Sequence, residues 1–272
     1  MVCEERAKAF AVIMLLGLCV TLAATRLVAA ARFNAVPPGR SSSADRAEAL
    51  LEKARAALGG TGALDDVKSL ILRRHDKTTI KILFPDRLQT IDSTPWGDAI
   101  NTLDGDRVWV RMPKLPDRFA APSATIEAGT SAVAQAARRH QIVECSLKYL
   151  LRPPVGYRMS NRYAGKVTFG STTGEAVEFA GPDDYWVSMI FDASTGLPKA
   201  QVRRIVGNPQ VNGTHLIQEL RDYRRSGDIL LPFEIAEYRL RLGRTEAMAV
   251  WKFAIEVNPP LKEADFREPS AR

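Results

Sequence analysis

The sequence predicts an α+β fold: a curled antiparallel sheet of about eleven strands, which forms an unclosed β-barrel covered on its concave face by helices. Three observations lead to this prediction. Apolar residues recur at helical spacing over 43–58, alternate with polar residues from 69 to 112, and alternate again from 157 to 257. A second helical stretch, 123–150, lies between the two runs of strands. Strands interrupted by a helical insertion are typical of α+β folds, and a twisted sheet of this size curls, closes or splits.

The first helix is marked at both of its ends. Ser42 with Asp45 three residues later is a capping-box pattern, and Gly59-Gly60 stops the helical spacing. In the strands that follow, turn residues such as Asp104-Gly105-Asp106 recur at short intervals. Close turns join neighbouring strands in opposite directions, so we expect an antiparallel sheet. The helical stretch 123–150 is then available to cover the concave face.

The first 31 residues resemble a targeting segment. Residues 9–24 form an apolar run of about 16 residues, which suits a secretion signal better than a spanning helix of about 20. Ala29-Ala30-Ala31 supplies the small residues for cleavage before Arg32. An uncleaved N-terminal anchor remains the alternative, because acidic residues accompany the basic ones before the run. We therefore expect a periplasmic protein, either released or tethered to the inner membrane.

After this segment we expect a linker at 32–42 and a single domain at 43–272. Hydrophobic residues are 46% and charged residues 25% of the chain, as in ordinary globular proteins. Only three histidines and three cysteines are present, which argues against a zinc cluster. We predict no cofactor, no metal and no catalytic residues. Removal of the targeting segment leaves Cys145 as the remaining cysteine, so we expect no intramolecular disulfide.

A family resemblance rests on several short stretches in a fixed order along residues 45–269. They are Ala56-Ala57-Leu58-Gly59-Gly60, Phe84-Pro85-Asp86-Arg87, Asp104-Gly105-Asp106-Arg107-Val108-Trp109, Phe191-Asp192-Ala193-Ser194-Thr195-Gly196-Leu197-Pro198, Gly227-Asp228-Ile229-Leu230-Leu231-Pro232-Phe233 and Val257-Asn258-Pro259-Pro260-Leu261. In these stretches the chain resembles the LolA/LolB-like outer-membrane lipoprotein carrier superfamily, in its uncharacterised exported branch. The resemblance implies an unclosed β-barrel with helices in its mouth and a hydrophobic cavity for acyl chains. It implies neither a catalytic residue nor a cofactor.

Alternation within the strands gives the candidates for lining such a cavity. Apolar side chains that share one face of their strand are expected to point into the concave face. These ligand-cavity candidates are Ile80, Ile82, Phe84, Val187, Met189, Phe191, Tyr238, Leu240, Trp251 and Phe253. The alternative reading of the same residues is a filled core beneath the helices, and the sequence leaves that choice open.

The net charge of +7 comes partly from arginines on the last strands. Arg239 and Arg241 alternate with Tyr238 and Leu240, so we expect the arginines to face outward. A basic outer surface suits solubility, an anionic membrane surface or an envelope protein. Nucleic acid is not an expected partner of an exported protein that lacks stacked aromatic residues between its basic ones.

Together these features predict a periplasmic, non-enzymatic binding or carrier protein. The expected ligand is a lipid, an acyl chain or a lipidated protein. The alternative is an envelope interaction or sensor module of the same fold that binds a protein partner. No Gly-x-Ser-x-Gly motif is present, and the three histidines are far apart in the sequence, so an enzyme is the least favoured class.

Overall fold

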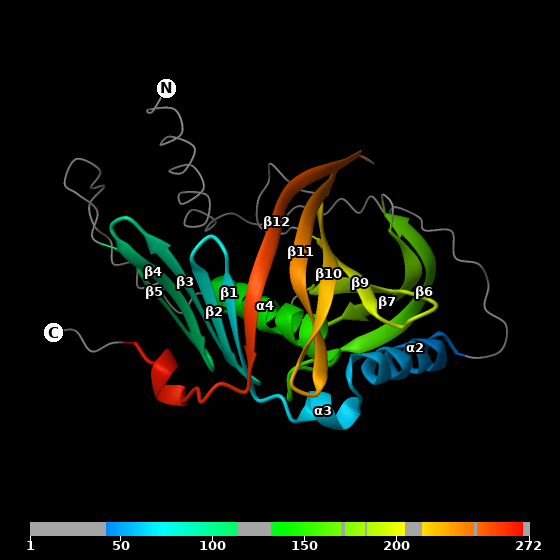
Figure 1. Ribbon diagram of the computed structural model, residues 1–272, viewed down its shortest axis with the longest axis horizontal. Helices are drawn as coiled ribbons and strands as arrows, with labels where there is room; N and C mark the ends of the chain where they lie inside the picture. The colour runs from blue at the N-terminus through cyan, green and yellow to red at the C-terminus, as the bar shows by residue number, and fades with distance from the viewer. Residues whose placement is uncertain are drawn as a thin grey trace.

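The computed structural model describes residues 42–113, 132–169, 172–182, 184–204, 214–241 and 244–268 (Figure 1). Its helices are α2 (Ser43–Leu58), α3 (Thr61–Asp65), α4 (Ala132–Leu150) and the short 3₁₀ helix η3 (Glu263–Phe266). Its strands are β1 (Ser69–Arg74), β2 (Thr78–Leu83), β3 (Arg87–Thr94), β4 (Gly97–Asp104), β5 (Arg107–Arg111), β6 (Ser160–Phe169), β7 (Thr172–Ala180), β8 (Trp186–Phe191), β9 (Pro198–Arg204), β10 (His215–Ser226), β11 (Ile229–Arg241) and β12 (Arg244–Val257). The predicted targeting segment, the linker up to residue 41 and the predicted helical residues 123–131 lie outside the described residues.

All twelve strands belong to one antiparallel sheet. Their order is β5-β4-β3-β2-β1-β12-β11-β10-β9-β8-β7-β6, so β5 and β6 form the two edges and the sheet does not close. Ten of these neighbours follow one another in sequence, but β1 pairs with β12, with Leu70 opposite Val257. The predicted α+β class and the curled, unclosed sheet are therefore confirmed, with twelve strands.

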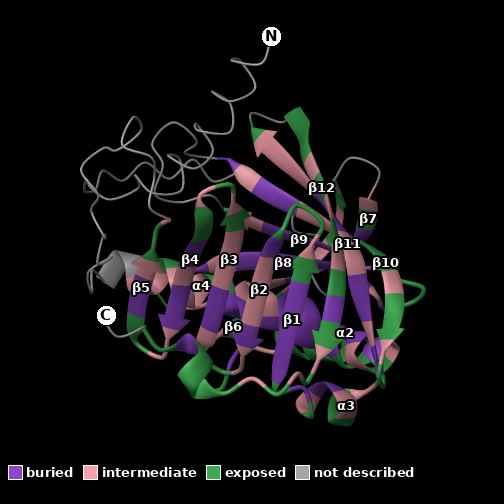
Figure 2. Cartoon of the chain, turned by 60° about the vertical axis from the view of Figure 1, so that its left-hand side comes forward, coloured by how far each residue is buried: buried purple, intermediate pink, exposed green. Residues whose placement is uncertain are grey.

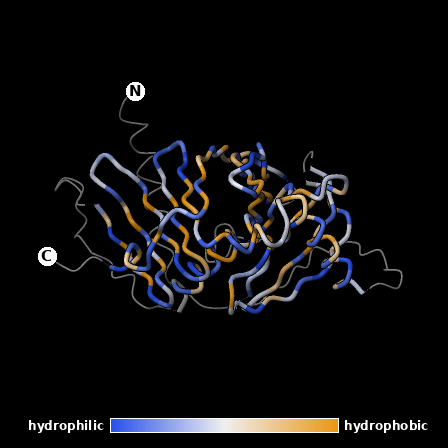
Figure 3. The backbone as a smooth tube through the Cα atoms, turned by 60° about the horizontal axis from the view of Figure 1, so that its bottom comes forward, coloured by the Kyte–Doolittle hydropathy of each residue, from blue (hydrophilic) through white to orange (hydrophobic). Residues whose placement is uncertain are grey.

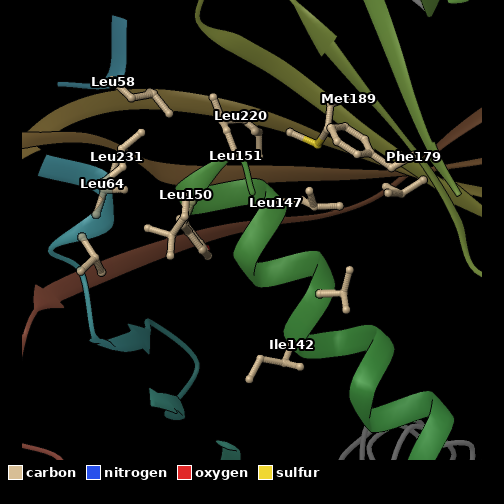
Figure 4. Packing of buried hydrophobic residues seen from close by; sticks show 14 of the residues in the cluster. Leu58, Leu64, Ile142, Leu147, Leu150, Leu151, Phe179, Met189, Leu220 and Leu231 are labelled. Atoms are coloured by element: carbon tan, nitrogen blue, oxygen red, sulfur yellow. The ribbon is translucent and has the colours of Figure 1, made fainter. Parts of the chain in front are cut away.

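Helices α2, α3 and α4 lie on one side of the curled sheet, whereas η3 packs against Gln89 and Trp109 on the other side. Helix α4 runs along the inside of the curve, and α2 and α3 lie at its lower end (Figures 1 and 2). We call the side that α4 covers the inner face and the opposite side the outer face. Buried side chains of all three helices meet the sheet here: Leu58 and Leu64 lie near Leu231, and Leu147 and Leu150 lie in the same cluster (Figure 4).

The start and end of α2 follow from its local sequence. The backbone N–H of Asp45 donates to Ser42 Oγ, and the Asp45 carboxylate accepts the backbone N–H of Ser42, so the predicted capping box is confirmed. At the other end Gly59 has φ of 130°, which glycine adopts without strain. A Cβ at Gly59 would lie 2.4 Å from the carbonyl oxygen of Asp228, so only glycine allows this close approach to the β10–β11 turn.

Hydrophobic residues occupy both faces of part of the sheet. The main core lies on the inner face, and a smaller cluster on strands β7 to β10 contains Ala176, Ile190, Ala200, Val202 and Ile217. Hydrophobic segments run through the strands, whereas many of the turns are hydrophilic (Figure 3). Among the described residues, none of the helices combines the length and apolar character needed to cross a membrane.

Candidate binding site on the inner face of the sheet

The inner face is the predicted binding surface, and the register of the strands fixes which side chains reach it. Residues directly opposite one another in an antiparallel sheet project to the same face. Arg203, Leu216 and Arg239 are opposite one another on β9, β10 and β11. Two residues further along each strand, and therefore on the same face, Gln201, Gln218 and Glu237 form a second line. Contacts of the second line with α4, described below, place both lines on the inner face.

Seven of the ten ligand-cavity candidates belong to the main core. Ile82, Val187, Met189 and Phe191 have no exposed surface. Ile80, Phe84 and Phe253 are half-buried against the same cluster. Trp251 is also half-buried, and it lies on the inner face because it is opposite the core residue Ile235.

Tyr238 and Leu240 are placed differently from the prediction. They pack against the smaller cluster on the outer face, and Tyr238 is opposite Ile217 of that cluster. Arg239 between them therefore faces inward, the reverse of what the alternation suggested. The reason is that β7 to β10 carry apolar residues on both faces, so an apolar side chain on the neighbouring β11 does not identify the inner face.

The part of the inner face that β8 contributes is covered in this conformation. Phe191, Met189 and Val187 are buried beneath α4, whose Val143 and Leu147 have no exposed surface. The two best-formed pockets have volumes of about 260 Å³, below the roughly 300–1,000 Å³ of typical small-molecule sites. Turn residues such as Asp192 and Asp228 line them, and none of the ten candidates does. A ligand that contacts Val187, Met189 and Phe191 therefore requires α4 to move.

Polar contacts fix α4 to the second inner line. The Lys148 ammonium donates to Gln218 Oε1 at 2.5 Å, and Gln218 Nε2 donates to Glu237 Oε1 at 2.7 Å. Gln201 Nε2 donates to the backbone carbonyl of Glu144 at 3.2 Å. Lys148 is only 7% exposed although its bonded partner is a neutral amide. A buried charge is costly without such hydrogen bonds, so these contacts are needed for α4 to lie where it does.

A second group of polar side chains surrounds the middle of α4. Glu144 Oε2 lies 3.4 Å from Arg203 Nε, and the ring of Tyr185 lies 4.6 Å from that of His140. Burial, and next the Glu144 carboxylate, raises the pKa of the Tyr185 hydroxyl. Cys145 keeps some exposed surface, but its thiol is desolvated and burial raises its pKa to about 11. This is the environment of a packed side chain.

Further along α4, Arg138 reaches the other half of the sheet. Its guanidinium donates to Asn101 Oδ1 of β4 at 2.8 Å and to Gln141 Oε1 of α4 at 2.7 Å. Burial lowers the pKa of Arg138, and the nearby Asp92 carboxylate opposes that shift. Helix α4 thus bridges both halves of the sheet through polar contacts, with its apolar residues between them.

The three histidines lie in separate environments. His75 is near Trp251, His140 is near Tyr185, and His215 is near Trp186. None of the described residues forms a group of three or more His, Cys, Asp or Glu side chains arranged to hold a metal ion.

Several residues of this face were not identified from the sequence. Lys148, Gln201 and Gln218 lie among apolar residues, and a search for apolar alternation passes over them. The sequence does contain a signal for Gln218. It shares one strand face with Leu216 and Leu220, both of which are buried. A polar residue within an apolar line indicates a hydrogen-bonded position in the core.

No protein-family model and no curated protein matches the chain. Among solved structures, it is similar to a LolA superfamily protein from Nitrosomonas europaea, with 13% identity, 82% of this chain and 97% of that chain covered, and a TM-score of 0.46. It is similar to a putative outer membrane lipoprotein-sorting protein domain from Vibrio parahaemolyticus, with 14% identity, coverage of 81% and 97%, and a TM-score of 0.41. A DUF1329 family protein from Desulfovibrio piger shows 11% identity, coverage of 84% and 98%, and a TM-score of 0.38.

These similarities concern the fold. One of the similar structures is a LolA superfamily protein, the superfamily that the sequence resembles.

Proposed function

We propose that this chain is an exported, non-enzymatic binding or carrier protein that holds a lipid, an acyl chain or a lipidated protein on the inner face of its sheet. The observation that carries the proposal is the apolar lining of that face beneath one helix. Val187, Met189 and Phe191 on β8 and Ile82 on β2 lie in a single core cluster. A displaced α4 would leave a trough lined by these apolar residues and by Gln201 and Gln218, which contact α4.

The free energies of burial for helix and ligand are comparable. Displacing α4 uncovers Ile142, Val143, Leu147 and Leu150, each of which contributes about 1.5–3 kcal/mol when buried. An acyl chain of about 16 carbons recovers roughly 13 kcal/mol relative to water, at about 0.8 kcal/mol per methylene. One acyl chain could therefore replace the apolar side of α4 without a large net cost.

The polar contacts of α4 favour a reversible exchange. Hydrogen bonds such as Lys148 to Gln218 and Arg138 to Asn101 can be replaced by bonds to water, and each is worth about 0.5–1.5 kcal/mol net, more where a charge is involved. Partly exposed Trp251 and Phe253 provide apolar surface at the inner face before α4 moves. We propose that a ligand first contacts these two residues.

Cys145 gives a direct test, because it lies on α4. In a variant with Cys3 and Cys19 replaced by serine, the rate of Cys145 labelling by a thiol reagent is measured at pH 8 with and without palmitate. At a pKa of about 11 only about one thiol in a thousand is ionised, so labelling of the free protein is slow. Displacement of α4 exposes the thiol, and we expect palmitate to accelerate labelling at least tenfold.

Hexanoate at the same concentration is the control, because its short chain recovers little apolar burial. Native mass spectrometry of the purified protein tests independently for co-purified lipid. Unchanged labelling at saturating palmitate, together with no co-purified lipid, contradicts the proposal.

The second candidate is an envelope interaction or sensor module. The complete burial of Val187, Met189 and Phe191 favours it, because a filled core needs no ligand. In that case the labelling rate of Cys145 is unaffected by lipid, and the protein acts through its surface.

A further inference from the structure

We infer that the upper part of β12, residues 244–251, is a docking site for an extended segment of a partner polypeptide, which adds to the sheet as another strand. The segment that fits is apolar in its middle and acidic at the end that lies beside the β11–β12 turn. This inference is independent of the lipid site on the inner face.

The first observation is an open strand edge within the sheet. Strand β12 pairs with β11 from Arg244 to Lys252, but its pairing with β1 begins only at Phe253. The backbone N–H of His75 donates to the carbonyl of Lys252 at 3.1 Å, and β1 ends there. In the part of the chain that the structure describes, residues 244–251 thus have a strand on one side only. The hairpin of β11 and β12 rises past the turn between β1 and β2 (Figures 1 and 2).

The second observation is that this segment is apolar and exposed. Residues 247–251 read Ala-Met-Ala-Val-Trp. Met248 and Val250 are 45% and 47% exposed, which makes them two of the four exposed large hydrophobic residues among those the structure describes. Apolar side chains beside unpaired backbone groups form a template for an added strand.

A strand fits this site better than a membrane does. Lipid would cover Met248 and Val250, but it would leave the backbone N–H and C=O groups of the open edge without hydrogen-bond partners, which is costly in an apolar medium. An extended peptide satisfies the side chains and the backbone together. The β-bulge opposite Glu237 and Tyr238 bends β12, which discourages indiscriminate pairing at the edge.

Charge indicates what kind of strand binds. At the tip of the hairpin, Arg241 and Arg244 are directly opposite one another and both are exposed. Like charges at opposed positions are destabilising, and an acidic residue beside them relieves this. Glu246 is close to the tip but is opposite Arg239. A second copy laid antiparallel along the same edge would place its Lys252 near Arg244, so charge disfavours self-association.

The test uses the full chain and a synthetic probe, the peptide acetyl-Thr-Val-Thr-Val-Thr-Val-Glu-Glu. Antiparallel to β12, this peptide places its acidic end beside Arg241 and Arg244. Binding is followed by fluorescence anisotropy of the labelled peptide and by hydrogen–deuterium exchange of the protein. We expect saturable binding and at least fivefold slower exchange confined to residues 244–251. A matched peptide that ends in Lys-Lys should bind at least tenfold more weakly.

Two variants distinguish binding at the open edge of β12 from nonspecific binding of the peptide. Val250→Lys puts a charge on the open edge and should abolish binding. Val155→Lys makes the same change at a residue that is 84% exposed away from this edge, and it should have no effect. Thermal unfolding of both variants checks that the fold is retained. The double variant Arg241→Glu and Arg244→Glu should reverse the preference between the two peptides.

Three results overturn the inference. One is the absence of protection at 244–251 with saturating probe. Another is a dimer that light scattering detects and that Val250→Lys dissociates. The edge of β12 would then bind a second copy of the chain. In the third, the protein binds anionic vesicles, Met248→Ser and Val250→Ser abolish that binding, and the peptide protects no residue from exchange. The surface then binds a membrane.

Discussion

The guanidinium carbon of Arg74 lies 3.9 Å from the centre of the Trp251 ring, at the place where the first and last strands of the sheet meet. Arg74 also forms an ion pair with Asp76 at 2.6 Å and donates to Thr78 Oγ1 at 2.8 Å. The indole is therefore held against a cation at the point where the pairing of β1 with β12 ends. This makes Trp251 a reporter of that junction.

Replacing Arg74 by methionine should lower the free energy of unfolding by about 1 kcal/mol, because a cation–π contact of about 0.5–1 kcal/mol is lost along with the Asp76 pair. In a background without the other three tryptophans, the emission of Trp251 should also shift. Urea unfolding followed by fluorescence measures both. Arg73→Met is the matched control: Arg73 pairs with the exposed Glu256, and we expect a change below about 0.5 kcal/mol. Equal effects of the two variants would show that the stacking on Trp251 contributes nothing.

Phe191→Ala should cost about 3–5 kcal/mol of unfolding free energy, since Phe191 has no exposed surface and its removal leaves a cavity in the main core. Phe253→Ala, at a half-buried position on the same face, should cost less than half as much. Both are measured by urea unfolding without added lipid. A cost below about 1.5 kcal/mol for Phe191→Ala would mean that the core around β8 is not tightly packed.

The Lys148–Gln218 hydrogen bond should be detectable as an energetic coupling. Gln218→Leu leaves a buried ammonium without its acceptor, and Lys148→Met leaves a buried amide without its donor. Each single change should cost about 1–3 kcal/mol, whereas the double variant should cost about 1–2 kcal/mol less than the sum. The exposed pair Arg73 and Glu256 gives the comparison, with an expected coupling below about 1 kcal/mol. Additive effects at Lys148 and Gln218 would contradict the role given to this contact.

Acid stability should depend on Asp192. The Ser194 hydroxyl, the backbone N–H of Thr195 and the Lys199 ammonium hold the pKa of its carboxyl well below the ordinary value. A depressed pKa adds stability above the unfolded pKa of about 4, and this stability is lost as pH falls through the lower native pKa. Asp192→Asn should thus be less stable than the unmodified chain at pH 7, and the difference should shrink by pH 2. Urea unfolding at both pH values checks this, and a constant difference would exclude the carboxylate as its source.

The N-terminal prediction concerns residues outside the described part of the chain. N-terminal sequencing of the protein from the cell envelope should begin at Arg32-Phe33-Asn34, because Ala29-Ala30-Ala31 supplies the cleavage residues. An intact Met1 in membrane-bound protein would establish the anchor instead.

Local patterns predicted much of the fold. Alternation and turn residues located the strands, and Ser42 with Asp45 marked the start of α2 correctly, because a capping box depends on residues only three positions apart. Helix α4, at Ala132–Leu150, falls within the predicted 123–150. The ligand-cavity candidates on β2, β8 and β12 reached the inner face because period-two alternation fixes the side of a strand.

The remaining features depend on contacts between distant residues. Nothing near Ser69 or Val257 indicates that β1 pairs with β12, since no turn joins them. Tyr238 and Leu240 were assigned to the inner face because alternation gives two faces but not which of them is covered. The hydrogen bond between Lys148 and Gln218 joins an inserted helix to a strand 70 residues away, a relationship that spacing does not encode.

The pairing of β1 with β12 has a consequence for how the chain folds. Strands β1 to β5 and strands β6 to β12 are each joined by successive short-range pairings. Among the described strands, β1 with β12 is the one pairing that links the two groups. Closing so long a loop costs more entropy than forming a hairpin, and long-range pairing is slow. The two groups of strands should therefore form first. They should pair with each other afterwards, along Leu70 of β1 and Val257 of β12. A chain truncated before β12, like a ribosome-bound nascent chain, would then hold two half-sheets that do not pair with each other. The edge of β1 would stay without a neighbouring strand until β12 emerges.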